Sequence, residues 1–343
     1  MSELPVSLKT IAKALNVSIS TVSRALKNHP DIGPEVTQRV QDLARELHYS
    51  PNPMAIGLLK NSSRIIGVIV PDLVTHFFAS IISGIESVAI EHGYYVVIRC
   101  SYESYEKELE CLDNLLKLRV EGIIMCLAQA THDYAHFEPL LAANTPLVFF
   151  DRVCLSEQVP TVVVNNREAA YHITRHFAAN GRQRIGHITG PPALNISRER
   201  IQGYRDGLVA EGLPFSDDLL VPCDLTVPGA TAATRQLLAL AEPPDAIFGI
   251  NDTTAFAAMK EIKRQGLRIP HDVALVGFTD EYHATVVEPT LTSVMHPTFE
   301  MGCTAAHLFL EQAGNKTKTP PQQVMLATQL VVRESSGAPF INH

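Results

Sequence analysis

From residue 65 onward, short apolar runs alternate with longer amphipathic stretches along the chain. Apolar runs of this length, bounded by turn residues, are typical of buried strands, and the stretches between them have helical spacing. Alternation of the two predicts βαβ units, and therefore an α/β fold with a parallel sheet. The predicted strands are 65–70, 94–100, 121–127 and 146–151, and the predicted helices are 76–93 and 105–119.

The same pattern begins again in the second half of the chain. Apolar runs at 184–190, 244–250 and 273–280 correspond to the first, third and fourth strands of the first half. Two similar βα lobes in tandem are the simplest explanation. Because ligands bind at the carboxyl ends of strands in such sheets, two facing lobes would form a hinged cleft for a small molecule.

Polar and aromatic residues gather just past these strand ends. Carboxylates, a guanidinium and neighbouring Phe rings suit a polyhydroxylated ligand, which needs bidentate hydrogen bonds and ring stacking. Asp and Asn after a strand also cap the following helix, so each has a structural alternative. The candidate ligand-binding residues are Asp72, Phe77, Phe78, Asp151, Arg200, Asn251, Thr279 and Asp280, with His76, Arg152 and Asp252 at the same strand ends.

The first 64 residues have a different pattern, with three short helices. Ser7 precedes the first, Ser18 can cap a second over 19–26, and Pro34 can open a third. Two short helices joined by about three residues predict a helix-turn-helix unit. A small helical bundle without DNA contacts is the alternative. The second helix would present groups suited to phosphates and base edges, namely Ile19, Ser20, Thr21, Ser23 and Arg24.

A short segment, residues 49–59, separates the helical unit from the first strand. Asn52 can cap a helix there and Pro53 can occupy its first turn. Gly57 costs about 1 kcal/mol within such a helix, and isolated helices this short are marginal in water. We therefore expect a segment that becomes helical only when something packs against it, with a simple tether as the alternative.

The distribution of charge changes the interpretation of the two regions. The whole chain has 28 Lys/Arg and 36 Asp/Glu residues, so its net charge is 28 − 36 = −8, which alone argues against nucleic-acid binding. Residues 1–64 hold eight Lys/Arg and five Asp/Glu, for +3, whereas the remainder holds 20 and 31, for −11. A basic head on an acidic body is consistent with DNA contact through the head alone.

Other function classes find little support. The chain has no GxSxG, P-loop, HExxH or GxGxxG motif, so we expect a binding protein rather than an enzyme. We expect no metal site or cofactor. The N-terminus lacks the apolar core of a signal peptide, and no apolar run approaches transmembrane length, so we expect a cytoplasmic protein without membrane contact. The cysteines lack CxxC spacing, so we expect reduced structural thiols at Cys100, Cys111, Cys126, Cys154, Cys223 and Cys303.

Residues 6–52 resemble the DNA-binding headpiece of the LacI/GalR family of bacterial transcription regulators, through the core AxxLxVSxxTVSRxL and the hinge entry HYSPN. The resemblance implies that Ile19, Ser20 and Arg24 face base edges. It implies phosphate contacts from Ser18, Thr21, Ser23 and Asn28. It also implies a hinge helix that pairs with its dimer mate in the minor groove, where Leu58 is the apolar wedge and neighbouring Leu59 the alternative. The remaining hinge contacts would come from Asn52 and Ala55.

The hinge departs from the family pattern at two positions. Ile56 stands where the family usually has Arg, and Pro53 is an added feature. The missing cation predicts a weaker minor-groove contact or a changed sequence preference.

The resemblance continues through the body in RIIGVIVPD with HFF, SRERIQGY, NDTTAFAAM, VALVGFTDE, EPTLTSV and LVVRESS. It implies a periplasmic-binding-protein-like two-lobed body and a homodimeric regulator, which we expect to be a repressor. Its partners would be operator DNA and a sugar-like effector. Phe78, Asp151, Arg200, Asn251 and Thr279 match effector-contacting positions, although many members have Asp where Thr279 stands. A transport receptor for sugars would share this body, but it would have no use for the helix-turn-helix unit.

The resemblance also implies a division of the chain into four parts. These are a headpiece (1–50), a hinge (51–64), a first lobe (65–164 with about 294–326) and a second lobe (165–293 with about 327–343). No leucine-heptad tail follows, which predicts a dimer rather than a tetramer.

Overall fold

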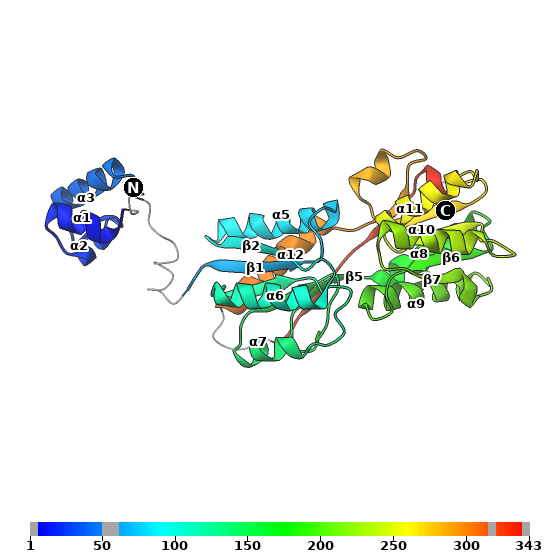
Figure 1. The fold of residues 1–343 in the computed structure, drawn as a ribbon, viewed down its shortest axis with the longest axis horizontal. Helices are drawn as coiled ribbons and strands as arrows, with labels where there is room; N and C mark the ends of the chain where they lie inside the picture. The colour runs from blue at the N-terminus through cyan, green and yellow to red at the C-terminus, as the bar shows by residue number, and fades with distance from the viewer. Residues whose placement is uncertain (1–5, 50–61, 315–319, 338–343) are drawn as a thin grey trace. The chain divides into compact units, whose positions relative to one another are not determined.

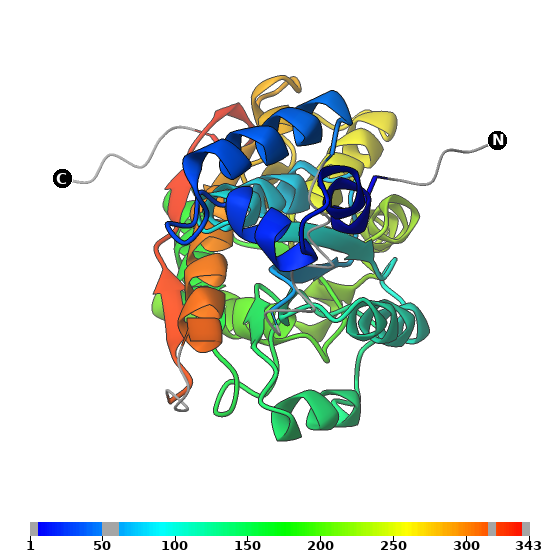
Figure 2. The same cartoon turned by 90° about the vertical axis from the view of Figure 1, so that its left-hand side faces the viewer.

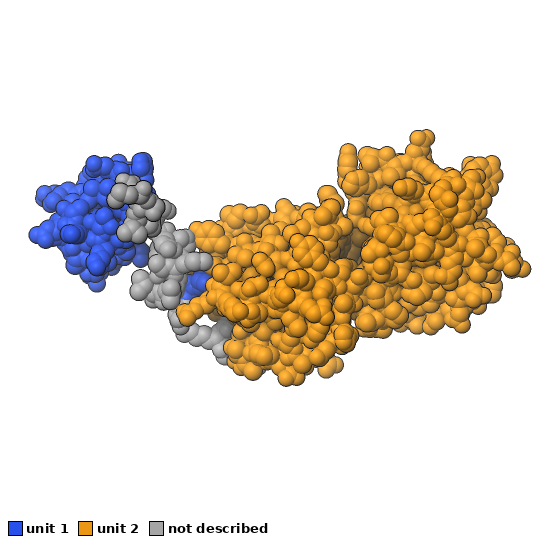
Figure 3. All heavy atoms as spheres, in the orientation of Figure 1, with its two compact units in different colours: residues 1–63 blue, residues 64–343 orange. Residues whose placement is uncertain are grey.

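The computed structural model describes residues 6–49, 62–314 and 320–337. The chain forms two compact units, residues 1–63 and residues 64–343 (Figure 3). The predicted hinge contacts Asn52, Ala55 and Leu58 lie outside the described residues.

The described part of the first unit contains the three helices that the sequence predicted for it: α1 (Leu8–Leu15), α2 (Ile19–Ala25) and α3 (Pro34–Glu46). Ser7 caps α1 through a reciprocal capping box with Thr10, and the Ser18 hydroxyl accepts a hydrogen bond from the Thr21 amide at 3.0 Å to cap α2. The three helices share one small apolar core, made of Ile11, Ala12, Val22, Ala25, Val40 and Ala44.

The second unit is built on two six-stranded sheets, shown in Figure 1. The first sheet has the order β11-β5-β4-β3-β1-β2 and is parallel throughout. The second has the order β12-β10-β9-β8-β6-β7, and only its edge strand β12 is antiparallel. The first sheet contains β1 (Ile65–Val70), β2 (Tyr95–Cys100), β3 (Gly122–Met125), β4 (Leu147–Phe150), β5 (Thr161–Val164) and β11 (Gln323–Leu326). The second contains β6 (Ile185–Thr189), β7 (Leu220–Pro222), β8 (Ala246–Gly249), β9 (Ala274–Thr279), β10 (Thr292–Met295) and β12 (Gln329–Val331).

Helices cover both faces of each sheet. The helices of the first lobe are α5 (His76–Glu91), α6 (Tyr105–Lys117), α7 (Glu138–Ala142) and α12 (Thr298–Gly314). Those of the second lobe are α8 (Asn166–Ala179), α9 (Asn195–Ala210), α10 (Val227–Leu238) and α11 (Asp252–Arg264). Short 3-10 turns occur at Ala135–Phe137, Asp217–Leu219, Tyr282–Thr285 and Glu334–Ser336.

The chain crosses between the lobes three times, because both sheets contain strands from distant parts of the sequence. It leaves the first sheet after β5, returns after β10 to form α12 and β11, and crosses again to form β12. In Figure 2, α12 (orange) and the last strands (red) run along the same flank of this unit. Crossings of this kind couple the position of one lobe to that of the other.

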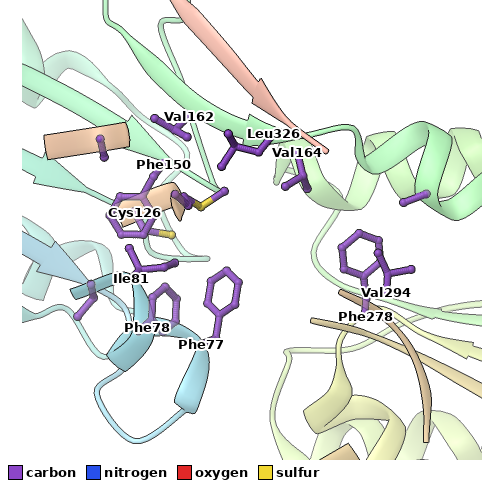
Figure 4. Packing of buried hydrophobic residues seen from close by; sticks show 14 of the residues in the cluster. Phe77, Phe78, Ile81, Cys126, Phe150, Val162, Val164, Phe278, Val294 and Leu326 are labelled. Carbon is purple, nitrogen blue, oxygen red and sulfur yellow. The ribbon is translucent and has the colours of Figure 1, made fainter. Parts of the chain in front are cut away.

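Alternate residues of the central strands pack on opposite faces, as the period of a strand requires. In β1, Ile66 and Val68 belong to the core beneath α5 and α12, whereas Ile65 and Ile69 belong to the core beneath α6. The first of these cores continues through the crossing region to residues of the second lobe, including Phe278 and Val294 (Figure 4).

Glycines allow two helix pairs to approach closely. A Cβ placed on Gly203 of α9 would lie 1.9 Å from a carbonyl oxygen of α8, and one on Gly302 of α12 would lie 2.0 Å from a carbonyl oxygen of α5. Larger residues at these positions would push the helices apart.

Candidate functional site

A cleft of about 430 Å³ opens between the two lobes of the second unit. This volume suits a small ligand. The cleft lies at the carboxyl ends of the strands, where the topology of parallel sheets places ligands. Seven of the eight predicted ligand-binding residues line it: Asp72, Phe77, Phe78, Asp151, Arg200, Asn251 and Thr279.

Asp280 is the predicted residue that the structure does not place on the cleft wall. Its carboxylate accepts a hydrogen bond of 2.6 Å from Arg333, in the segment that follows β12. Thr279 and Asp280 are neighbours at the end of β9, so their side chains point in different directions. Asp280 therefore binds the C-terminal segment through Arg333 instead of facing the cleft.

Asp151 and Arg200 form the charged centre of the cleft. Asp151 follows β4, is 6% exposed, and has a φ of 57°, in the left-handed region where the strand ends. Burial raises the pKa of this carboxyl, and the nearby charges of Arg152 and Arg200 oppose the increase. The structure therefore holds a buried carboxylate beside a guanidinium, an arrangement suited to hydroxyl groups that both donate and accept.

Arg200 is held rigidly from α9. Its Nε donates to Asn166 at 2.9 Å, one terminal nitrogen donates to the Ile250 carbonyl, and its guanidinium carbon lies 3.6 Å from the centre of the Phe278 ring. Burial lowers the pKa of Arg200 to about 10, which leaves it charged at neutral pH, and the Asp151 charge favours that state. A charge fixed in this way is pre-organised for a ligand.

A second guanidinium, from Arg152, lies on the first lobe. It donates to both carboxylate oxygens of Glu103, at 2.9 and 2.7 Å, and Glu103 also accepts from the Gln129 amide at 2.7 Å. Arg152 is 6% exposed, and the Glu103 charge raises its pKa against the effect of burial. All three residues line the cleft, but only Arg152 was noted in the sequence, since the others lie in loops without a local signal.

Two of the predicted residues also cap helices or turns, so the structural alternative holds for them as well. The Asn251 side chain accepts from the Thr254 amide at 2.8 Å, and the Asp72 carboxylate accepts from the amides of Val74 and Thr75. Asp252 is fully buried and bonded to the Ser293 hydroxyl at 2.6 Å. It therefore stiffens the junction between α11 and β10.

Aromatic rings line one side of the cleft. Phe77 and Phe78, at the start of α5, meet edge to face with centroids 5.0 Å apart (Figure 4). Phe77 also meets the His296 ring edge to face, with centroids 4.9 Å apart. His76 is exposed and does not line the cleft. His296 follows β10 at a crossing between the lobes, a position that the sequence pattern did not single out.

Several buried polar atoms on the cleft walls have no hydrogen-bond partner among the described residues. They are Thr75 Oγ1, Gln129 Oε1, Arg152 Nε, Thr279 Oγ1, and Nδ1 and Nε2 of His296. An unpaired buried polar group costs about 1–3 kcal/mol, so native proteins rarely retain several without a reason. Donors and acceptors on a bound ligand would complete these groups.

Asn195, the first residue of α9, connects the two lobes directly. Its Nδ2 donates to the Asp151 carbonyl at 3.1 Å, and its Oδ1 accepts from the Val153 amide, also at 3.1 Å. Asn195 is 9% exposed. The bonds hold the second lobe against the loop that carries the cleft carboxylate.

In the first unit, the predicted DNA-contacting residues gather on α2 and its ends. Ile19, Ser20 and Arg24 are exposed, and Thr21 and Ser23 are half-buried. The Ser18 hydroxyl is engaged as the helix cap, and Asn28 accepts a hydrogen bond of 2.8 Å from Gln41 of α3. Arg24 lies 3.6 Å from Asp31 with both side chains more than half exposed, so that pair contributes little and leaves the guanidinium free to move.

Other kinds of site are not seen among the described residues. No group of three or more His, Cys, Asp and Glu side chains in that part of the chain is arranged to hold a metal ion. All six cysteines are free thiols, of which Cys111, Cys126, Cys154 and Cys223 are buried. No described helix is both long enough and apolar enough to span a bilayer.

These features define a class of protein, with a two-lobed ligand-binding body on a chain that also carries a helix-turn-helix unit. Residues 63–334 match the family model for periplasmic binding proteins and the sugar binding domain of the LacI family, and residues 7–52 match that for bacterial regulatory proteins of the lacI family. The chain therefore belongs to the lacI family of bacterial regulatory proteins, which confirms the resemblance seen in its sequence.

Similar proteins extend over almost the whole chain. The transcriptional repressor CytR of Escherichia coli K12 is 32% identical over 98% of both chains, and catabolite control protein A of Priestia megaterium is 30% identical over 96% of this chain and 99% of its own. Among solved structures, a lac repressor dimer bound to operator and the anti-inducer ONPF matches with a TM-score of 0.85 and 26% identity, over 98% of this chain and all of that one. A complex of the regulator CelR with cellobiose matches with a TM-score of 0.73 and 29% identity, over 96% and 99% of the two chains.

Proposed function

We propose that this chain is a transcriptional repressor that binds operator DNA as a homodimer and changes its operator affinity when a sugar-like effector occupies the cleft. The observation that carries the proposal is the set of buried, unpartnered polar groups on the walls of the cleft, in a chain that also has a helix-turn-helix unit. Its relatives are transcriptional regulators, which supports binding rather than catalysis. As a DNA-binding regulator it would act in the cytoplasm.

In the proposed DNA complex, α2 lies in the major groove. Ile19, Ser20 and Arg24 would contact base edges, which is supported by their exposure at one face of the helix. Ser18, Thr21, Ser23 and Asn28 would contact phosphates. The hinge contacts Asn52, Ala55 and Leu58 would lie in the minor groove, where the apolar Leu58 would separate a base step.

In the proposed effector complex, hydroxyl groups of the ligand would donate to Asp151 and accept from Arg200. Phe77 and Phe78 would pack against its apolar face. Asp72, Asn251 and Thr279 would add contacts at the rim. Asp280 is not included, because its carboxylate is bound to Arg333.

The two sites would communicate through the relative position of the lobes. A ligand that touches both lobes stabilises one degree of closure, and the dimer would pass that change to its hinge segments. Coupling of this kind is worth about 1–3 kcal/mol and acts equally in both directions.

A gel-shift experiment at fixed salt tests the DNA part of the proposal. The operator would be selected from a random duplex pool with the full-length protein. Arg24→Ala should weaken operator binding by about 1–3 kcal/mol and relax the preference at one base pair. Arg45→Ala is the matched control, since Arg45 is an exposed cation of the same unit that lies on α3 and pairs with Asp42. Equal affinity of wild type and Arg24→Ala would remove Arg24 from the interface.

A further inference from the structure

Carboxylates outnumber guanidinium groups on the walls of the cleft. The five carboxylates belong to Asp72, Glu103, Asp151, Asp224 and Glu281, against two guanidinium groups, from Arg152 and Arg200, so the formal balance is 2 − 5 = −3. A cleft with low-dielectric walls and charges mainly of one sign concentrates their field and repels ligands of that sign.

Both guanidinium groups already have protein partners. Arg152 is paired with the carboxylate of Glu103, and Arg200 is held by Asn166, the Ile250 carbonyl and the face of Phe278. A phosphate or carboxylate on a ligand would find the charge of Arg152 already neutralised by Glu103, and the charge of Arg200 offset by the buried Asp151 carboxylate. It would have to displace Glu103 or lie beside the buried Asp151 carboxylate.

His296 adds a neutral group to the same wall. It is 4% exposed and packs between the rings of Phe77 and Phe278, with centroids at 4.9 and 6.1 Å. Burial, assisted by the nearby charge of Arg200, lowers the pKa of His296 to about 3, so the imidazole is uncharged at physiological pH.

The ring of His296 has one donor and one acceptor, and neither nitrogen has a partner among the described residues. A hydroxyl or amide group can serve either nitrogen, because it both donates and accepts. An anion can use only the N–H and is repelled by the lone pair of the other nitrogen.

We infer that the cleft accepts an uncharged ligand with hydroxyl or amide groups and excludes anionic ligands such as phosphate esters, and that His296 is a specificity-determining contact for that ligand. This inference rests on the proposed function, because it concerns the effector of the same cleft. It narrows a sugar-like effector to the unphosphorylated form.

Matched pairs of neutral and anionic compounds test the charge rule. The full-length protein would be screened by thermal shift and calorimetry against ribose and ribose 5-phosphate, glucose and glucose 6-phosphate, and adenosine and AMP, with cellobiose as a neutral disaccharide. We expect at least one neutral compound to stabilise the protein, since a ligand at about 100 times its Kd adds about 2.7 kcal/mol. We expect no phosphate ester to do so at millimolar concentration.

The outcomes separate this inference from the proposed function. A response to phosphate esters would overturn the charge rule and leave effector control in place. No response to any compound, with operator binding intact, would overturn effector binding and the charge rule together.

Substitutions at His296 test its role with the responding neutral ligand. His296→Leu should raise the Kd at least about tenfold, equivalent to 1.4 kcal/mol. His296→Gln, which keeps a neutral donor and acceptor, should bind within about threefold of wild type, well under 1.4 kcal/mol. If His296→Leu does not fold, His296→Ala takes its place.

His187→Gln is the matched control, because His187 is also fully buried and uncharged, but it stacks on Phe248 away from the cleft lining. Wild-type ligand affinity in His296→Leu, or in His296→Ala where that variant replaces it, would overturn the assignment. A loss in His187→Gln as large as in His296→Leu would show a general effect of core substitution and would overturn it as well.

Discussion

Replacement of Asn195 by Ala should weaken effector binding without preventing folding. Asn195 makes two hydrogen bonds between the lobes, to the Asp151 carbonyl and from the Val153 amide, and both are 3.1 Å long. A hydrogen bond of this kind is worth about 0.5–1.5 kcal/mol, so the two together favour this lobe arrangement by about 1–3 kcal/mol. That corresponds to a factor of about 5–150 in the equilibrium between closed and open lobes, and apparent ligand affinity should fall by up to the same factor.

Calorimetry with the effector and small-angle scattering of the free protein would measure this effect. We expect a raised Kd, and a larger radius of gyration in the absence of ligand. Gln202→Ala is the matched control, because Gln202 lies on the same helix and is exposed, and its side chain donates to Asp206 one turn later rather than to the other lobe. If Asn195→Ala binds the effector with wild-type affinity and scatters like wild type, the idea that these bonds hold the lobes together is wrong.

Two stability predictions follow from buried groups. Burial lowers the pKa values of His176, His187 and His296 to about 4, 3 and 3. Below pH 6.5 the unfolded chain therefore binds more protons than the folded chain, and the free energy of unfolding decreases as the pH is lowered. Asp252, whose pKa is raised to about 6, gains a proton in the folded state and offsets about 1 kcal/mol of this loss, which leaves about 3–4 kcal/mol between pH 6.5 and 5. Urea unfolding at the two pH values checks this, and an unchanged midpoint would contradict it. Gly203→Ala should destabilise the body by about 1–3 kcal/mol, because its methyl group would meet a carbonyl of α8 at 1.9 Å; a thermal midpoint equal to that of wild type would show that the helices can separate freely.

Local signals in the sequence were sufficient for the helices of the first unit and for the central strands. Ser7, Ser18 and Pro34 mark helix starts, and the structure places helices directly after or at them. The runs 65–70 and 273–280 were recognised as strands because a strand buried on both faces is apolar at nearly every position. The short strands β11 and β12 were not predicted, since their hydrogen-bond partners lie far away in the sequence.

The cleft was predictable where its residues follow strands. Asp151 and Asn251 come directly after apolar runs, and the topology of a parallel sheet brings such positions together. Asn195 and His296 were missed because their roles depend on how the two lobes meet, which no local pattern encodes. Asp280 was expected at the cleft, whereas its carboxylate accepts from Arg333, because a strand end specifies a position but not the direction of each side chain.

Reciprocal coupling between effector and operator is the central claim, and one pair of titrations tests it most directly. Operator affinity would be measured with and without saturating effector, and effector affinity with and without operator, for the full-length protein at one salt concentration. We expect effector to change the operator Kd, and operator to change the effector Kd, by the same factor of about 5–150. In Arg200→Ala, which should still bind operator, we expect effector to leave the operator Kd unchanged. An effector that binds wild type tightly but leaves its operator affinity unchanged would contradict the account.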